Sequence, residues 1–406
     1  MKRFITCSSS LPIRSAWVSV EIFRILGLVS TRGQGWAGPP ADEAGQEESV
    51  TSRVDPAREV HVYAGTAGHS AWFSDDLGET WVHPNSHSGM YLEARVWSLA
   101  SHPESPERLF AGTDMGVFRW DEPTARWALL NSPMQDVWAV AVDPADPDTL
   151  LAGTRPAGFW RSTNGGETWR QLSAPGLSQF SEVNMGPTRV TQILYDAVDS
   201  DTVWAGVEIG SVYRSRDRGL TWERKDNGLV SGDVHGLAVV PLPGGGKAVL
   251  ATTNRGLHRS EDNGESWQLQ ELLSPWPYTR GVVPRADGSG VVFLANGNGP
   301  PGNDGFLLRS RDHGRSWQDA KLPGPLESSV WCIATDASDP MLVFVGTNLG
   351  ELFRSSDGGD TWTRLPHVFG ELRALHWRAL RAGTRRAAHS ITRPTLKAAQ
   401  MGWKVA

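Results

Sequence analysis

The chain has 406 residues, of which 39% are hydrophobic and 21% charged, so it can bury a large core, and it contains no run of 18 apolar residues that would span a membrane. Its net charge is −6, but eight Lys/Arg and no Asp/Glu follow position 372, which leaves −14 for residues 1–372 and disfavours nucleic acid as a partner. The 44 glycines, 26 prolines and 19 tryptophans favour many short strands joined by tight turns over helices.

Residues 1–59 differ from the rest of the chain, and we expect a poorly ordered extension and linker there. Residues 16–30 resemble the apolar core of a signal peptide, but Glu21 and Arg24 interrupt it and no clear cleavage site follows. The two cysteines, Cys7 and Cys332, suggest no disulfide framework of the kind found in small secreted domains. We therefore expect a cytoplasmic protein, with export by a degenerate signal as the alternative.

From residue 74 onward, an eight-residue pattern recurs: S-x-D/N-x-G-x-S/T-W, called here the repeat motif. Near-complete copies occupy residues 74–81, 162–169, 215–222, 260–267, 310–317 and 355–362. A seventh, degenerate copy runs from Trp120 to Trp127, with Glu122 in place of the aspartate. The seven terminal tryptophans are 46, 42, 53, 45, 50 and 45 residues apart, a period that suits one four-stranded propeller blade.

Each repeat predicts four strands, which in the third repeat are residues 137–142, 149–153, 159–162 and 168–172. The motif is then the turn between the third and fourth strands. Its Asp accepts backbone N–H bonds, its Gly permits a positive φ, and its Trp packs against the neighbouring sheet. An arginine precedes the motif serine in six copies, and this periodicity favours inter-blade hydrogen bonding over ligand contact: Arg119, Arg161, Arg214, Arg259, Arg309 and Arg354.

The two ends of the repeat region do not form complete blades. Residues 60–64, 71–74 and 80–83 supply three strands of the first blade but no inner strand, whereas residues 371–377 match the inner-strand pattern of residues 233–239. We therefore predict an all-β, seven-bladed propeller over residues 60–378, closed by its C-terminal strand. Residues 379–406 are expected to be a solvated basic tail, or alternatively a contact for an acidic partner.

The repeat motif resembles the Asp-box, or BNR, repeat of sialidase-like propellers, sortilin-type receptors, xyloglucan hydrolases and photosystem II assembly-factor propellers. The resemblance covers about residues 60–378 and implies a ligand site at the top of the central channel. A classical sialidase is not expected, because the early F/Y-R-I-P motif of that family is absent and sialidases commonly have six blades, against seven counted here.

The top face of the predicted propeller carries the blade-to-blade loops and the loops between second and third strands. Aligned inner strands begin there with a first ring of residues: Arg95, Asp136, Arg189, Asp233, Tyr278, Ser329 and Glu371. A second ring follows two residues later: Trp97, Trp138, Thr191, His235, Arg280, Trp331 and Arg373. The second-to-third loops add five further residues: Asp114, Arg155, Glu208, Arg255 and Asn348.

These positions vary between blades, which favours a ligand site over a repeated structural role. Arginines and aromatic rings suit a small anionic or sugar-like ligand, and the expected binding residues are Arg95, Arg155, Arg189, His235, Arg255, Arg280, Trp331 and Arg373. Glu208 and Asp114 are the candidate acid/base residues. Alternatively, these side chains pair with one another around a water-filled channel. No cofactor and no metal are expected, because His69, His83 and His87, although spaced so that they could bind a metal, lie in or near a loop and lack a matching set of Cys or carboxylate ligands.

Two functions stay open at this point. The missing sialidase motif favours a noncatalytic propeller that binds a small anionic molecule or a protein partner. The alternative is a glycosidase-like hydrolase or lyase acting on a sugar or sugar acid at the same site. A ring filled by internal ion pairs would favour binding alone, whereas a carboxyl with a raised pKa beside an open pocket would favour catalysis.

Overall fold

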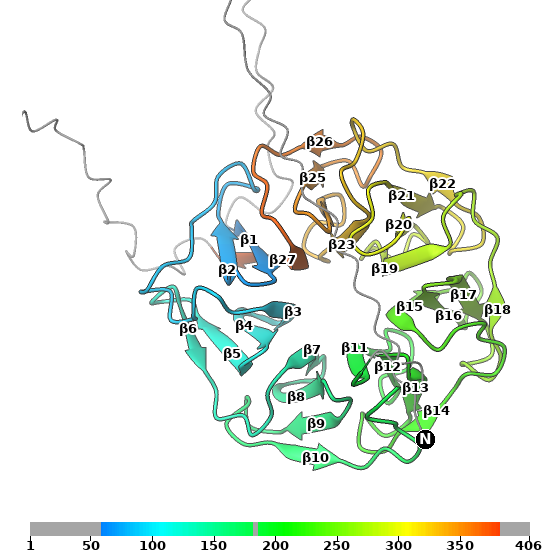
Figure 1. Ribbon diagram of the computed structural model, residues 1–406, viewed down its shortest axis with the longest axis horizontal. Coiled ribbons are helices and arrows are strands. Elements are labelled where there is room, and N and C mark those ends of the chain that lie inside the picture. Colours follow the sequence, from blue (N-terminus) through cyan, green and yellow to red (C-terminus); the bar gives the residue numbers. More distant parts are fainter. Residues whose placement is uncertain (1–57, 182–185, 382–406) are drawn as a thin grey trace, which may run out of the picture. The chain divides into compact units, whose positions relative to one another are not determined.

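A computed structural model describes residues 58–181 and 186–381 of the chain (Figure 1). These residues form 27 strands and no helix, and the strands build seven antiparallel sheets arranged as blades around a central channel. The predicted all-β, seven-bladed propeller is therefore confirmed. The predictions for the N-terminal extension and for most of the basic tail fall on residues 1–57 and 382–406, which lie outside the described residues.

Blades 2 to 4 each contain four strands in chain order. Blade 2 is β3 (Val96–His102), β4 (Ser105–Thr113), β5 (Gly116–Asp121) and β6 (Arg126–Leu129). Blade 3 is β7 (Val137–Asp143), β8 (Asp146–Thr154), β9 (Phe159–Ser162) and β10 (Arg170–Leu172). Blade 4 is β11 (Arg189–Tyr195), β12 (Val203–Glu208), β13 (Ser211–Ser215) and β14 (Glu223–Arg224).

Blades 5 to 7 repeat this order. Blade 5 is β15 (Val234–Pro241), β16 (Lys247–Thr253), β17 (Gly256–Ser260) and β18 (Gln268–Leu269). Blade 6 is β19 (Tyr278–Pro284), β20 (Val292–Gly297), β21 (Gly305–Ser310) and β22 (Gln318–Asp319). Blade 7 is β23 (Val330–Ala334), β24 (Val343–Thr347), β25 (Leu352–Ser355) and β26 (Thr363–Arg364).

Blade 1 closes the ring with strands from both ends of the described chain. β27 (Leu372–Arg381) is its inner strand and pairs with β1 (Arg58–Thr66), which pairs in turn with β2 (Ala71–Ser74). The predicted closure is confirmed, but the strands reach beyond the predicted limits of 60–378. Ala379 and Leu380, assigned to the tail from the sequence, are only 3% and 2% exposed, and their burial extends the sheet to Arg381.

The predicted outer strand of blade 1, residues 80–83, is reduced to a single bridge between Phe73 and Val82. In blades 5, 6 and 7, the residue three positions after the motif tryptophan donates its backbone N–H across the sheet, as Gln270 does to Leu257 O at 2.8 Å. The equivalent residue of blade 1 is Pro84, which has no N–H to donate. Blade 1 therefore has three strands and one bridge where the sequence predicted four strands.

The repeat motif is a hydrogen-bonded turn, as blade 5 illustrates. Asp262 Oδ1 accepts bonds from the Ser266 N–H at 2.9 Å and from the Ser260 hydroxyl at 2.7 Å, and Gly264 has φ 80°. Trp267 is 4% exposed and packs in a cluster with Trp204 of blade 4. Burial acts to raise the pKa of Asp262, but the hydrogen bonds from Ser266 and Ser260 outweigh it and lower this pKa to about 2.

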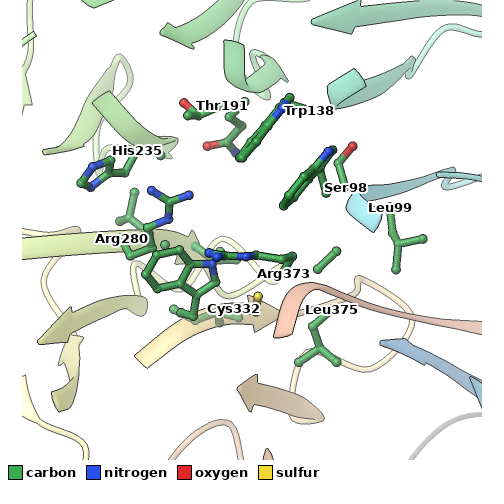
Figure 2. A pocket seen from close by; sticks show the side chains of 18 residues that line it. Ser98, Leu99, Trp138, Thr191, His235, Arg280, Cys332, Arg373 and Leu375 are labelled. Atoms are coloured by element: carbon green, nitrogen blue, oxygen red, sulfur yellow. The ribbon is translucent and has the colours of Figure 1, made fainter. Parts of the chain in front are cut away.

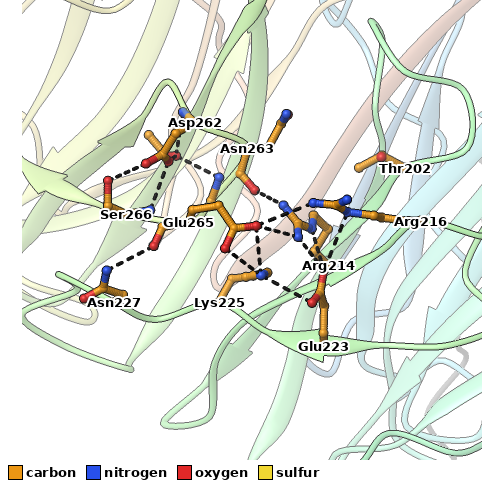
Figure 3. Close-up of polar contacts among 12 residues, drawn as sticks. Thr202, Arg214, Arg216, Glu223, Lys225, Asn227, Asp262, Asn263, Glu265 and Ser266 are labelled. Atoms are coloured by element: carbon orange, nitrogen blue, oxygen red, sulfur yellow. Dashed lines mark hydrogen bonds and ion pairs between the residues drawn. The ribbon is translucent and has the colours of Figure 1, made fainter.

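The arginine before the motif serine links neighbouring blades in four of the six copies. Arg214, which is 2% exposed, donates to the Asn263 carbonyl and to Glu265 at 2.8 Å, both in the motif of blade 5 (Figure 3). Three other arginines reach the motif turn of the following blade in the same way: Arg259, Arg309 and Arg354. This confirms the inter-blade role for these four, whereas Arg119 is exposed.

Candidate functional site

A cavity of about 210 Å³ lies in the central channel below the top face (Figure 2). All seven residues of the predicted second ring line it: Trp97, Trp138, Thr191, His235, Arg280, Trp331 and Arg373. Every blade therefore contributes one of these side chains. The order of the strands and the alternation of side chains along them were sufficient to predict this ring from the sequence.

The backbone at the second ring is irregular in every blade. Ladder pairing skips one or two residues of each inner strand, as between Val96 and Ser98 in blade 2 and between Val330 and Cys332 in blade 7. The other five inner strands show the same shift at the ring position. Such β-bulges leave a residue outside the ladder and redirect its side chain. Each bulge here contains one of the seven second-ring residues, which line the channel.

Two stacked indoles form one wall of the cavity. The rings of Trp97 and Trp138 lie 4.0 Å apart at an angle of 11°, and the Arg189 guanidinium lies 4.2 Å over Trp138. The Nε1–H groups of both tryptophans donate to Asp136 Oδ1, at 3.0 and 2.9 Å. Asp136 therefore fixes the orientation of both rings.

Asp136 is a half-buried carboxyl with a perturbed pKa. Burial raises its pKa and the like charge of Asp114 raises it further, against the hydrogen bonds of the two indoles and the charge of Arg155. Its backbone has φ 49°, which is uncommon for a residue other than glycine. The Asp136 N–H donates to the Asp114 carbonyl at 3.2 Å, so the two acidic residues are neighbours in adjacent blades.

Glu208, a predicted acid/base residue, is instead an ion-pair partner of arginines. Its Oε2 accepts from Arg189 Nε at 2.6 Å, its Oε1 is bound by Arg189 Nη2, and Arg280 Nη1 lies 3.9 Å away. The Glu208 side chain is 8% exposed. Because Arg189 engages both carboxylate oxygens, Glu208 is poorly placed to exchange a proton with a substrate.

A second aromatic wall carries two further arginines. The guanidinium groups of Arg280 and Arg373 lie 4.2 and 4.9 Å from the ring centroid of Trp331. In Figure 2 both guanidinium groups lie close together within the cavity. Burial lowers the pKa of Arg373 to about 10, and the like charges of Arg280 and Arg189 contribute.

A buried histidine and a buried tyrosine complete this side. His235 Nδ1 lies 2.7 Å from the Thr279 carbonyl, and its Nε2 lies 3.5 Å from Asp233. Burial acts to raise the pKa of Asp233, but His235 and the two arginines Arg280 and Arg189 outweigh it and lower this pKa. The Tyr278 ring lies 4.9 Å from that of His235.

The remaining predicted site residues surround the channel without lining the cavity. Arg95 and Arg255 are exposed, and the Arg95 N–H donates to Asp114 Oδ1 at 3.0 Å. Arg155 lies near enough to Asp136 to influence its pKa. Asp136 belongs to the predicted first ring but was not among the predicted acid/base residues. Asp136 stands two residues before Trp138, and this spacing was the one sequence signal for their contact.

Within residues 58–181 and 186–381, no group of three or more His, Cys, Asp or Glu side chains could hold a metal ion. The same described residues contain no helix with the length and apolar character of a membrane span. Cys332 lines the cavity, and burial raises the pKa of its thiol to about 12, so the thiolate is strongly disfavoured.

No family model matches the chain. It is 27% identical over 339 residues to a xyloglucanase of Paenibacillus sp, and the alignment covers 75% of this chain and 30% of that protein. It is 24% identical over 348 residues to xyloglucanase Xgh74A of Acetivibrio thermocellus, covering 75% of this chain and 36% of the relative. The crystal structure of a GH74 enzyme from Niastella koreensis is similar with a TM-score of 0.54 and 22% identity, over 66% of this chain and 45% of that chain.

The structural likeness shows that the chain shares its propeller fold with the GH74 enzyme. The chain spans about a third of the length of the curated relatives that it matches.

Proposed function

We propose that this protein is a glycoside-hydrolase-like propeller that binds a sugar polymer at the channel mouth and hydrolyses a glycosidic bond there. The observation that carries the proposal is Asp136, a carboxyl with a raised pKa that adjoins a stacked tryptophan pair and a second acidic residue, Asp114. The curated relatives named as xyloglucanases, similar over 75% of the chain, support a polysaccharide substrate.

The chemistry follows from the different surroundings of the two aspartates. Glycoside hydrolysis needs a protonated carboxyl to donate to the departing oxygen and an ionised carboxylate on the other side of the bond. Asp136 is the acid, because burial and the neighbouring Asp114 charge favour its protonated form. Asp114 is the carboxylate that acts on the water or on the anomeric carbon.

The tryptophan pair would position the sugar. Trp138 is covered by Trp97 on one side and by the Arg189 guanidinium at 4.2 Å, and it is only 9% exposed. Trp97 is half-buried and lines the cavity, so it offers the ring against which a sugar can stack. Asp136 holds the Trp97 indole by its N–H and therefore lies beside the bound sugar.

The test is release of reducing ends from xyloglucan and a panel of other plant polysaccharides by the full-length protein. Asp136→Asn and Asp114→Asn should each lower the rate at least about 100-fold, the usual worth of an acid or base, while the melting temperature changes little. Glu271→Gln, at an exposed carboxyl on a top loop, is the matched control and should keep full activity. Activity should fall as the pH rises through the raised pKa of Asp136, because the acid must be protonated. Unchanged rates in both aspartate variants would contradict the proposal.

Noncatalytic binding of an anionic ligand or a partner is the second candidate, and the Arg189–Glu208 ion pair favours it. Glu208 is occupied by Arg189, as expected at a site that only binds. A catalytic carboxyl would have to be free to exchange a proton. This candidate predicts that no polysaccharide of the same panel releases reducing ends.

A further inference from the structure

The cavity that the tryptophan pair borders is lined by basic side chains and by no carboxylate. Its 18 lining residues include Arg280, Arg373 and His235, and none of the 18 is Asp or Glu. We propose that the sugar unit that enters this cavity is a uronic acid whose carboxylate binds between Arg280 and Arg373. The inference rests on the proposed function, because it specifies the chemical class of the sugar polymer.

The nearby carboxylates Glu208, Asp233 and Glu371 satisfy these two arginines only in part. Glu208 lies 3.9 Å from Arg280 Nη1, beyond hydrogen-bond distance, and both of its oxygens bind Arg189. Glu371 contacts Arg373 Nη2 but is 43% exposed, so water weakens that pair. Arg373 Nε is buried and has no hydrogen-bond partner among the described residues.

The Arg280 and Arg373 side chains are only 13% and 19% exposed, and two guanidinium groups held close together with so little water are costly unless an anion neutralises them. Burial, and then the like charges of Arg280 and Arg189, lower the pKa of Arg373 to about 10, which means that its charged form is disfavoured at this position. Both guanidinium groups lie over the Trp331 ring, within the range of a cation–π contact. Planar guanidinium groups held in this way present paired N–H donors to the two oxygens of a carboxylate.

The size and the lining of the cavity favour one acidic sugar unit over a larger anion. Its volume of about 210 Å³ is below the roughly 300–1,000 Å³ typical of sites for drug-sized ligands. Its walls combine the indoles of Trp97 and Trp331 with polar groups such as Thr191. The Trp97 face for the sugar ring, polar groups for its hydroxyls and arginines for a carboxylate together fit a uronic acid.

The test compares trigalacturonate with its fully methyl-esterified form, which has the same sugar chain without charge. Titration calorimetry with the full-length protein should give at least about tenfold tighter binding of the acid, and the preference should shrink as salt is added. Arg373→Met and Arg280→Met should each reduce the preference to below about twofold while binding of the ester persists. Arg216→Met, at a 65% exposed arginine of the blade 4 motif, is the matched control and should keep the preference.

Equal affinity of the wild-type protein for the acid and the ester would overturn the uronic acid inference, and this result needs no variant to fold. If neutral oligosaccharides are then bound or cleaved, the proposed function stands without the inference. If the protein binds neither charged nor neutral oligosaccharides, the proposed function itself fails. A melting-temperature measurement on each arginine variant separates loss of the preference from loss of the fold.

Discussion

At the scale of single residues, the motif aspartates are the hydrogen-bond acceptors that hold the motif turns together. Asp262 and Asp312 both have pKa values lowered to about 2, because hydrogen bonds from motif hydroxyls and backbone amides outweigh the opposing effect of burial. The third repeat has Asn164 at this position, and its Oδ1 accepts the same backbone bond, from Thr168 at 3.0 Å. The turn therefore requires the acceptor oxygen more than the charge.

We expect Asp262→Ala to lower the free energy of unfolding by about 1–3 kcal/mol, the usual range for lost hydrogen bonds. Asp262→Asn should cost less, because the amide keeps an acceptor oxygen. The folded pKa of Asp262, about 2, lies below the ordinary 3.8. The stabilisation by its carboxylate should therefore be fully present above pH 4 and be lost between pH 4 and 2 in the wild-type protein. Denaturant unfolding across this pH range would show a weaker decline in the Asn variant, and an identical decline would contradict the assignment.

Arg373 contrasts with the motif aspartates, because we expect its charge to lower the stability of the fold. Its side chain is only 19% exposed and lies close to the like charge of Arg280, so Arg373→Met should raise the melting temperature of the ligand-free protein. Thermal unfolding at pH 7 measures the effect, with Arg216→Met as the exposed control. A lower melting temperature would mean that the contact with Glu371 and the stacking on Trp331 stabilise more than the burial of charge costs.

At the scale of elements, the degenerate motif of blade 2 serves the seam between blades 1 and 2. Glu122 is 2% exposed, and its Oε2 accepts from Arg378 of β27 and from Trp120, both at 2.6 Å. His61 of β1 lies 3.1 Å from Glu122 Oε1. The carboxylate that replaced the motif aspartate therefore binds both strands that close the ring.

Removing one partner of this buried pair should be costly. Glu122→Ala and Arg378→Met should each lower the free energy of unfolding by about 3–5 kcal/mol, because each leaves an unpaired buried charge. The double variant should lose clearly less than the sum of the single losses. A double-mutant cycle by denaturant unfolding measures this coupling, and additive losses would show that the two residues act independently.

At the scale of the whole molecule, β27 determines whether the ring is closed. Ending the chain after Gly370 removes the inner strand of blade 1 and exposes the edge of β1, so this truncation should aggregate or melt at a much lower temperature. Ending it after Arg381 keeps every residue of β27 and should leave the melting temperature of the propeller unchanged. Soluble yield and thermal unfolding of the two truncations, compared side by side, test the closure, and equal behaviour would contradict it.

The repeat motif made most of this architecture predictable. Tryptophan spacing predicts the blades, and alternation of inner-strand residues identifies the ring that lines the cavity. The partners of each ring residue were not predictable, because Glu208 and Arg189 meet across strands and Asp136 bonds to tryptophans of two blades. The bulges were also missed, since they depend on ladder pairing and leave no clear residue signature. The three-stranded form of blade 1 could have been predicted from Pro84.

The seven bulges have a consequence for how this protein can change. A residue that ladder pairing skips can be exchanged with little effect on the register of its sheet. Some ring side chains also bond to the next blade, as Thr191 does to the Val234 carbonyl and His235 to the Thr279 carbonyl. Ring side chains that make no such bond can then be replaced one blade at a time without loss of strand pairing, and each replacement changes the chemistry that the cavity presents.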